Sequence, residues 1–192
     1  VLLRSELDAL NAQLNPHFLF NTLNNIDSLI HSNTNKASEA LITLSEIMRY
    51  MLYDAKKPQV SLKQEIAHYS NIVNLQMLRL KDASKVRFAT DANADVAVAP
   101  LLFLPFIENA FKYAVLDTAH SGIDIELKTV GTQVVFKCRN SYQKHNATVQ
   151  GKTGGIGLTN LKRRLELLYP QRYSLKIDEE NAYFSVQLTI EP

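Results

Sequence analysis

Cysteine is nearly absent from this 192-residue sequence, charge of one sign does not predominate, and long apolar runs are missing. The single cysteine, Cys138, excludes a disulfide within the chain and leaves too few thiolates for a structural zinc site, which fits a reducing compartment. The net charge of +2 comes without a basic run, so the composition does not support nucleic acid as a partner. No segment reaches the ~18 consecutive apolar residues of a membrane span, and no signal peptide is apparent.

The chain has an ordinary globular composition, with 46% hydrophobic residues and length enough for one large domain or two small ones. It begins at Val1 without an initiator methionine, inside a heptad pattern formed by Leu3, Leu7, Leu10 and Leu14. We therefore expect the cytoplasmic portion of a longer protein, whose upstream part carries any sensor domain.

The first predicted helix runs from about Val1 to Ile30. On a helical wheel, one face carries apolar residues and the opposite face carries polar ones: Leu19, Leu23, Ile26 and Ile30 against His17, Asn21, Asn24 and Ser28. His17 is thus expected to point outward. The upstream leucine stripe points to the side that His17 occupies, so we expect a kink or a change of partner at Pro16.

A polar cluster, His31 to Asn35, is suited to a turn and a helix cap before a second helix. The apolar positions of that helix form one broad stripe: Ala37, Leu41, Leu44, Met48 and Met51, flanked by Ala40, Ile47 and Leu52. One antiparallel neighbour cannot cover such a stripe, which predicts a dimeric four-helix bundle. The alternative is that the stripes pack on the rest of the same chain.

Asp54 to Gln59 interrupts the helical pattern and marks the expected boundary between residues 1–56 and 57–192. Ser61 and Gln64 form a capping box that opens a third helix, whose apolar face carries Leu62, Ile66, Tyr69, Val73 and Leu80. Further on, alternating apolar residues predict strands near residues 86–90, 123–127, 134–138, 173–177 and 184–190. Helices are expected at 101–115 and after a polar loop that ends at Gly157. The prediction is an α+β fold with one sheet covered on one face by helices.

Three groups of residues suit phosphoryl transfer, which needs a nucleophile, a metal ligand and donors that cradle phosphates. The exposed imidazole of His17 is a competent phosphoryl acceptor. Asn109 lies in an apolar helix, where its amide oxygen could bind magnesium, and Lys112 one turn on could meet phosphate. A surface pair between Glu108 and Lys112 would leave Asn109 unexplained. Glycines at 154–157 precede a helix whose N-terminus can receive an anion.

These groups resemble the motifs of a known family, in the family's order. Pro16 to Asn21, followed by Leu23 and Asn24, resembles the phosphoacceptor box of LytS/YehU-type sensor histidine kinases. Leu104 to Tyr113 resembles the N box of the GHKL ATP-binding fold, and Gly155 to Asn160 with Arg164 to Tyr169 resembles its G box and the following helix. The resemblance covers nearly the whole chain: a dimerisation and phosphoacceptor hairpin over 1–56, and a two-layer catalytic ATP-binding domain over 57–192.

The resemblance implies a homodimeric kinase core that transfers the γ-phosphoryl of MgATP to His17 and then to an aspartate of a response regulator, of LytTR type. It also implies an upstream sensor in the bacterial inner membrane. Asn109 would bind magnesium, Glu108 would be the base, and Asn21 would position a water for dephosphorylation of the regulator. The remaining residues expected to contact ATP are Lys112, Tyr113, Asn140, Gly155, Gly157 and Leu158.

The sequence departs from the family pattern at two places. Cys138 to Tyr142 stands where many relatives have Asp-x-Gly-x-Gly, so Asn140 can accept a bond from the adenine amino group only without charge assistance. Phe18 follows the histidine where many histidine kinases have an acidic residue. A second hypothesis is therefore a degenerate kinase that serves as a dimeric scaffold. A stand-alone ATPase of the gyrase type fits less well, because Pro105 stands where those enzymes have the catalytic glutamate.

Overall fold

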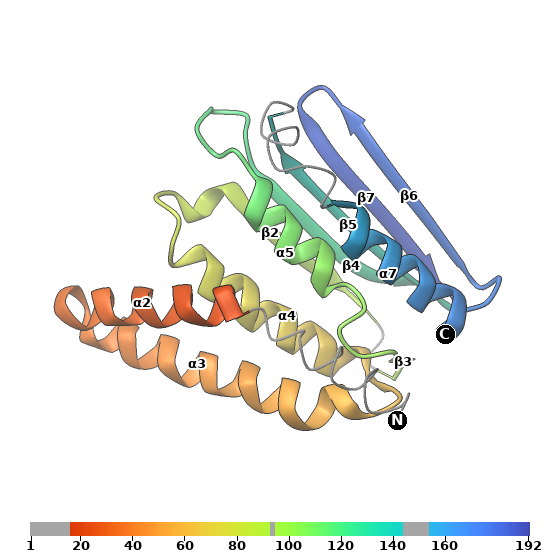
Figure 1. Cartoon of the computed structure of the whole chain (residues 1–192), viewed down its shortest axis with the longest axis horizontal. Coiled ribbons are helices and arrows are strands. Elements are labelled where there is room, and N and C mark those ends of the chain that lie inside the picture. Colours follow the sequence, from red (N-terminus) through yellow and green to blue (C-terminus); the bar gives the residue numbers. More distant parts are fainter. Residues whose placement is uncertain (1–15, 93–94, 144–153) are drawn as a thin grey trace.

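The computed structural model describes residues 16–92, 95–143 and 154–192, and it has an α+β fold, as the sequence predicts (Figure 1). The helices are α2 (Pro16–Ser32), α3 (Thr34–Tyr53), α4 (Leu62–Met77), α5 (Leu104–Tyr113) and α7 (Gly154–Leu168), with short turns η1 (Asp54–Lys56) and η2 (Ala83–Lys85). The strands are β1 (Val60–Ser61), β2 (Val86–Asp91), β3 (Ala97–Val98), β4 (Ile123–Val130), β5 (Gln133–Ser141), β6 (Tyr173–Glu180) and β7 (Tyr183–Ile190). The leucine heptads before Pro16, and the kink expected there, lie outside the described residues.

Helices α2 and α3 form the predicted helical hairpin. A single residue, Asn33, separates them, and its side chain accepts a hydrogen bond from the backbone N–H of Lys36 at 3.1 Å. This bond satisfies one of the amides that a helix leaves unpaired at its start. The chain reverses at this cap, so that α2 lies along α3 in Figure 1.

The apolar face of α2 is only partly covered within the chain. Thr22 and Ile26 are buried, whereas Leu23 and Ile30 are 43% and 51% exposed. The 3.6-residue period fixes the spacing of apolar positions but not which neighbour they meet. Helix α3 packs along the line of Thr22 and Ile26, and this leaves Leu23 and Ile30 at an uncovered edge.

Helix α3 is covered from two sides, by α2 and by α4. Its buried residues are Ala37, Ala40, Leu44, Ile47 and Tyr50. Leu41 and Leu52, which the sequence places on the stripe, are exposed. Helix α4 covers the side of α3 that carries Ile47 and Tyr50. On this side, the alternative that the stripe packs on the same chain is therefore correct.

The β-strands of the second half form, within the described residues, a five-stranded sheet in the order β2-β4-β5-β7-β6. Strands β2 and β4 are parallel and the other neighbours are antiparallel. Two tight turns use left-handed backbone, at Gly131 (φ 61°) and at Asn181 and Ala182 (φ 50° and 62°). Alternate residues of β4, β5 and β7 are buried, which puts one face of the sheet against the helices as predicted.

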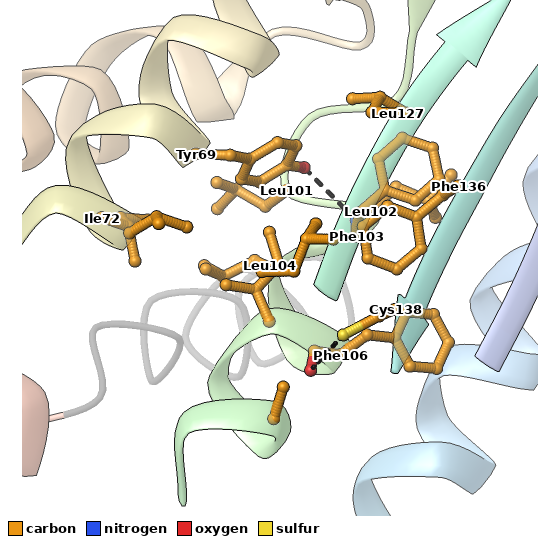
Figure 2. Close-up of a cluster of buried hydrophobic side chains, with 14 of the residues drawn as sticks. Tyr69, Ile72, Leu101, Leu102, Phe103, Leu104, Phe106, Leu127, Phe136 and Cys138 are labelled. Carbon is orange, nitrogen blue, oxygen red and sulfur yellow. Dashed lines mark hydrogen bonds between the residues drawn. The ribbon is translucent and has the colours of Figure 1, made fainter. Parts of the chain in front are cut away.

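The core lies between that face and the helices. Phe103 stacks on Phe136 of β5 with ring centroids 4.9 Å apart, and Phe106 of α5 lies 5.8 Å from the same ring. Figure 2 shows these rings between the sheet and α4, which contributes Tyr69 and Ile72. The core continues into the hairpin, so that the buried residues form one cluster from α2 to the sheet.

Several predicted boundaries shift. Helix α5 starts at Leu104 and not at Leu101, because the residues before it form a turn in which Leu101 has a φ of 56°. Helix α7 begins at Gly154, so the glycines lie in its first turn and not in a loop before it. The interruption after Tyr53 is confirmed, and no helix of the described residues is long and apolar enough to cross a membrane.

The contact between α3 and α4 is unusually polar. The predicted capping box of Ser61 and Gln64 fixes the start of α4, and the helix then buries Glu65 and His68 beside its apolar residues. Tyr50 donates a hydrogen bond to Glu65 and stacks on His68 with ring centroids 4.2 Å apart. Neither ring nitrogen of His68 has a hydrogen-bond partner in the described part of the chain.

His68 should make the stability of the fold depend on pH. Burial lowers the pKa of His68 from 6.5 to about 4, so the unfolded chain binds a proton at pH values where the folded chain does not. The free energy of unfolding therefore keeps its full value above pH 6.5. It falls by up to about 3 kcal/mol as the pH is lowered toward 4. Urea unfolding of the parent and of His68→Phe at pH 5 and pH 8 measures this.

His68→Phe keeps the stack on Tyr50 and removes both unpaired nitrogens, so it should be more stable than the parent, and by a larger margin at pH 5. Burial raises the pKa of Glu65, which favours the folded state as the pH falls and opposes the effect of His68. The difference between parent and variant cancels this common contribution. An equal margin at both pH values would contradict the prediction.

Candidate functional site

Helix α5 has one apolar and one polar face. Phe106, Ile107 and Ala110 are buried against the sheet, whereas Asn109 and Lys112, three residues apart, are exposed together. Pro105 near the first turn fits a position whose amide has no helical partner. The ammonium of Lys112 lies 4.9 Å from the ring centroid of half-buried Tyr113. The last turn of α5 therefore presents an amide oxygen and a cation on one side.

Strand β5 runs beneath α5 in the same direction. Phe103 stacks on Phe136, and the Cys138 thiol lies 3.8 Å from the carbonyl oxygen of Phe106. The next residue of β5 that points to the helices is Asn140, which is 3% exposed. Because β5 and α5 advance together, from Phe136 at Phe103 to Cys138 at Phe106, Asn140 lies under the last turn of α5.

Hydrogen bonds close this end of the helix onto the strand. The N–H of Val115, just beyond α5, donates to the carbonyl of Ser141 at 3.0 Å, and the hydroxyl of Ser141 donates back to the carbonyl of Val115 at 2.6 Å. The amide nitrogen of Asn140 donates to the carbonyl of Ser141 at 3.2 Å. Its amide oxygen remains the atom available to accept a bond from a ligand.

The third predicted element, the glycine-rich start of α7, lies on the same side of the sheet. Figure 1 shows α7 running opposite to α5 along this face. Its later turns are tied to the residues before α5: Arg164 donates to the carbonyl of Pro100 at 2.7 Å, and the hydroxyl of Tyr169 accepts from the N–H of Ala99 at 2.9 Å. The first turn, with Gly155 and Gly157, therefore lies toward the other end of α5, where Asn109 is. Leu158 follows it and is half-buried.

His17 is on a different part of the molecule. Its backbone is in the first turn of α2, and its side chain is outside what the structure describes. Packing leads from α2 to α3, from α3 to α4 and from α4 to α5. The structure thus brings together Asn109, Lys112, Tyr113 and Asn140, whereas the helix of His17 makes its main contact with α3 and not with α5. Asn21 on α2 and Glu108 on α5 are both half-buried.

Sequence reasoning missed the buried carboxylate of Glu65. Its oxygens accept hydrogen bonds from the hydroxyls of Tyr50 and Tyr69, and from the N–H of Leu101 at 3.0 and 3.1 Å. The available signal was its position, because Leu62, Glu65 and Tyr69 share one face of α4. A carboxylate on a buried stripe needs several donors.

The open face of the sheet is a weaker candidate. Two shallow hollows lie there, of about 240 and 340 Å³. The first is lined by side chains of both signs, and Arg87 pairs with Asp124 at 2.8 Å across β2 and β4. Because these charges compensate one another, we interpret the hollows as the solvated side of the sheet.

Thiolate chemistry is not favoured at Cys138. Its side chain points into the core beside Phe106, and burial raises the pKa of the thiol to about 12. A thiol of that pKa is protonated at neutral pH and is neither a nucleophile nor a metal ligand. The candidate chemistry therefore rests with the amides, the cation and the helix terminus around α5.

Comparison with known proteins agrees with these motifs. Residues 5–84 match the family model described as histidine kinase. Over 97% of its length the chain is 30% identical to sensor protein LytS of Staphylococcus saprophyticus, and over 93% it is 29% identical to sensor histidine kinase/phosphatase LytS of Staphylococcus aureus. Over nearly its whole length, this chain is similar to the LytS-type histidine kinases.

The chain spans about a third of the length of the curated relatives it matches, 34% and 33% of these two. Its fold is also that of a solved histidine kinase domain, from the blue-light activated histidine kinase EL346 of Erythrobacter litoralis. The two share a TM-score of 0.51 and 16% identity, over 85% of this chain and 86% of that one. Hairpin and sheet domain thus occur together in a known kinase domain.

Proposed function

We propose that this chain is the catalytic core of a two-component sensor kinase, which phosphorylates His17 from MgATP and passes the phosphoryl group to an aspartate of a response regulator. The observation that carries the proposal is the grouping of Asn109, Lys112 and Asn140 at one end of α5, in a chain whose acceptor box lies within the matched residues 5–84. We assign residues 1–56 to dimerisation and phosphoacceptance, and 57–192 to ATP binding.

The residues present fit a magnesium nucleotide. The exposed amide oxygen of Asn109 is a hard ligand of the kind that magnesium takes, and Lys112 beside it supplies a positive charge. Unpaired N–H groups in the first turn of α7, near Gly155 and Gly157, favour an anion. Tyr113 and Leu158 are half-buried at the edges of this region. When bound, MgATP supplies the phosphoryl group and part of the charge neutralisation that its transfer needs.

His17 must reach the end of α5 for transfer. In this structure α2 packs mainly on α3, and α5 packs on the sheet and α4, so the acceptor comes either from a rearranged chain or from a second copy. Glu108, half-buried next to Asn109, is our candidate for the base that withdraws the imidazole proton. One relative is named a kinase/phosphatase, and we assign a dephosphorylating role to Asn21, one turn after His17.

The partners follow from the same proposal. A receiver domain, of LytTR type by family resemblance, is the acceptor for phosphate from His17. The uncovered Leu23 and Ile30 of α2 support a homodimer through the hairpins. We place the chain on the cytoplasmic side of the bacterial inner membrane, downstream of a sensor domain.

The central test is phosphorylation of the protein itself. After incubation with γ-labelled ATP and magnesium, the parent should carry label that survives base and is lost in acid, as expected for phosphohistidine. His17→Ala removes the acceptor and Asn109→Ala removes the magnesium ligand, so both should lose the label almost completely. Asn74→Ala, an exposed amide on α4, is the matched control and should keep it.

An unlabelled parent that remains dimeric would contradict the kinase proposal and favour the scaffold function, which Asn140 and Tyr142 suggest. Label that persists in His17→Ala would place the acceptor elsewhere. Nucleotide hydrolysis without any label, unaffected by His17→Ala, would instead indicate a stand-alone ATPase.

Asn140 provides a test of nucleotide binding. Asn140→Asp restores the negative charge at the acceptor for the adenine amino group, and a charge-assisted bond should strengthen ATP binding by about tenfold. Isothermal titration with a non-hydrolysable ATP analogue measures it. The same titration with the GTP analogue should show no gain, since the carboxylate offers no donor to the guanine oxygen. A gain for both nucleotides, or for neither, would remove Asn140 from the adenine site.

The dimer is tested at the uncovered edge of α2. Leu23→Glu together with Ile30→Glu introduces charge where the proposed partner helix packs, so sedimentation equilibrium should shift from dimer to monomer by at least about tenfold in dissociation constant. Leu167→Glu, at a residue 74% exposed on α7, is the matched control and should leave the dimer intact. A monomeric parent, or a dimer insensitive to the α2 changes, would contradict the proposed interface.

A further inference from the structure

The residues that lead into α5 are held by hydrogen bonds from several helices. We call Val98 to Phe103 the anchor segment. Its bonds are Ala99 N–H to Tyr169 Oη, Arg164 to Pro100 O, Leu101 N–H to Glu65, and Phe103 N–H to Tyr69 Oη, at 2.9, 2.7, 3.0 and 3.3 Å. Figure 2 shows Tyr69 pointing from α4 to the backbone of this segment. Residues of α4 and α7, together with Tyr169 just after α7, therefore hold the anchor segment, which precedes the helix of the proposed magnesium ligand.

The anchor segment is strained at Leu101. Its φ of 56° is in the left-handed region, where the Cβ of a residue other than glycine crowds the following carbonyl oxygen. The N–H of Leu101 in this conformation points to both oxygens of Glu65. Strain of this kind persists only where the surroundings over-determine it, and here Glu65 is the group that does so.

Glu65 is in turn bound from the hairpin. Tyr50 of α3 donates to the same carboxylate oxygen, Oε1, that accepts from Leu101. Burial raises the pKa of Glu65, while the bonds from Tyr50, Tyr69 and Leu101 act against that rise. The guanidinium of Arg164, which is half-buried, contributes favourably to the charged form. The carboxylate is thus shared between the hairpin and the segment that precedes α5.

We propose that Glu65 is a positioning residue that couples the hairpin, through Tyr50, to the anchor segment and so to the helices that bind nucleotide. Movement of α3 against α4 removes one donor from Glu65, loosens its hold on Leu101 and lets α5 and α7 shift. The predicted effect on nucleotide binding rests on the proposed function. The predicted effect on the anchor segment does not.

Tyr50→Phe is the sharpest test, because it removes one hydroxyl and keeps the ring stacked on His68. Amide hydrogen exchange of the whole chain should become about tenfold faster in peptides that cover residues 98–113, the loss expected for one bond to a charged group. The dissociation constant of a non-hydrolysable ATP analogue should rise at least about fivefold. Glu65→Gln, which cannot accept on both sides, should accelerate the same peptides.

Two control variants separate coupling from simple loosening. Tyr53→Phe makes the same change at a tyrosine 69% exposed on the same helix. Asn71→Ala removes a second polar contact between α3 and α4, the 3.0 Å bond to Glu46. Both should leave exchange at residues 98–113 and the nucleotide dissociation constant at parental values.

Unchanged exchange at residues 98–113 in Tyr50→Phe, or an equal effect in Asn71→Ala, would overturn the coupling. Faster exchange there without any change in nucleotide affinity would also overturn it, provided that the parent binds nucleotide. A parent that binds no nucleotide would refute the proposed function alone, and the exchange measurement would then decide the link between Tyr50 and the anchor segment.

Discussion

A buried carboxylate fixes the relation between the two halves of this molecule. Removing an ionised group from water costs several kcal/mol unless donors replace the lost hydration, and Glu65 obtains its donors from α3, α4 and the backbone of Leu101. Each donor sits on an element that other contacts also hold. The hairpin can therefore shift on α4 only by losing the hydrogen bond from Tyr50 to Glu65. Apolar burial provides the bulk of the attraction, and the carboxylate selects the geometry.

Local patterns predicted the elements well, because the interactions that start and stop them are local. The cap at Asn33 and the box of Ser61 and Gln64 involve residues three apart, and the strands follow from strict alternation. The partial exposure of the apolar face of α2 has the opposite cause. Period gives the spacing of a stripe, whereas the partner that covers it is decided by residues far away in sequence, as Leu23 and Ile30 demonstrate.

The same distinction applies to the candidate site. Asn109 and Lys112 could be singled out because an amide and a cation one turn apart are conspicuous in an apolar helix. The hydrogen bond from Ser141 to Val115 joins positions 26 residues apart, and the bond from Arg164 to Pro100 joins positions 64 residues apart. No short window of sequence contains them. The left-handed Leu101 was equally hidden, since leucine gives no turn signal.

The separation of α2 from α5 constrains how such a core can work. In the proposed function, an acceptor helix that packed directly on the nucleotide helices would leave transfer without control. Here α2 packs mainly on α3, and the contact between α3 and α4 is polar where it meets the anchor segment. An apolar contact tolerates sliding, because dispersion changes gradually with position. A contact through short directional bonds to one carboxylate is either formed or broken. We infer that an interface of this kind favours discrete positions of the hairpin over gradual sliding, as a switch requires.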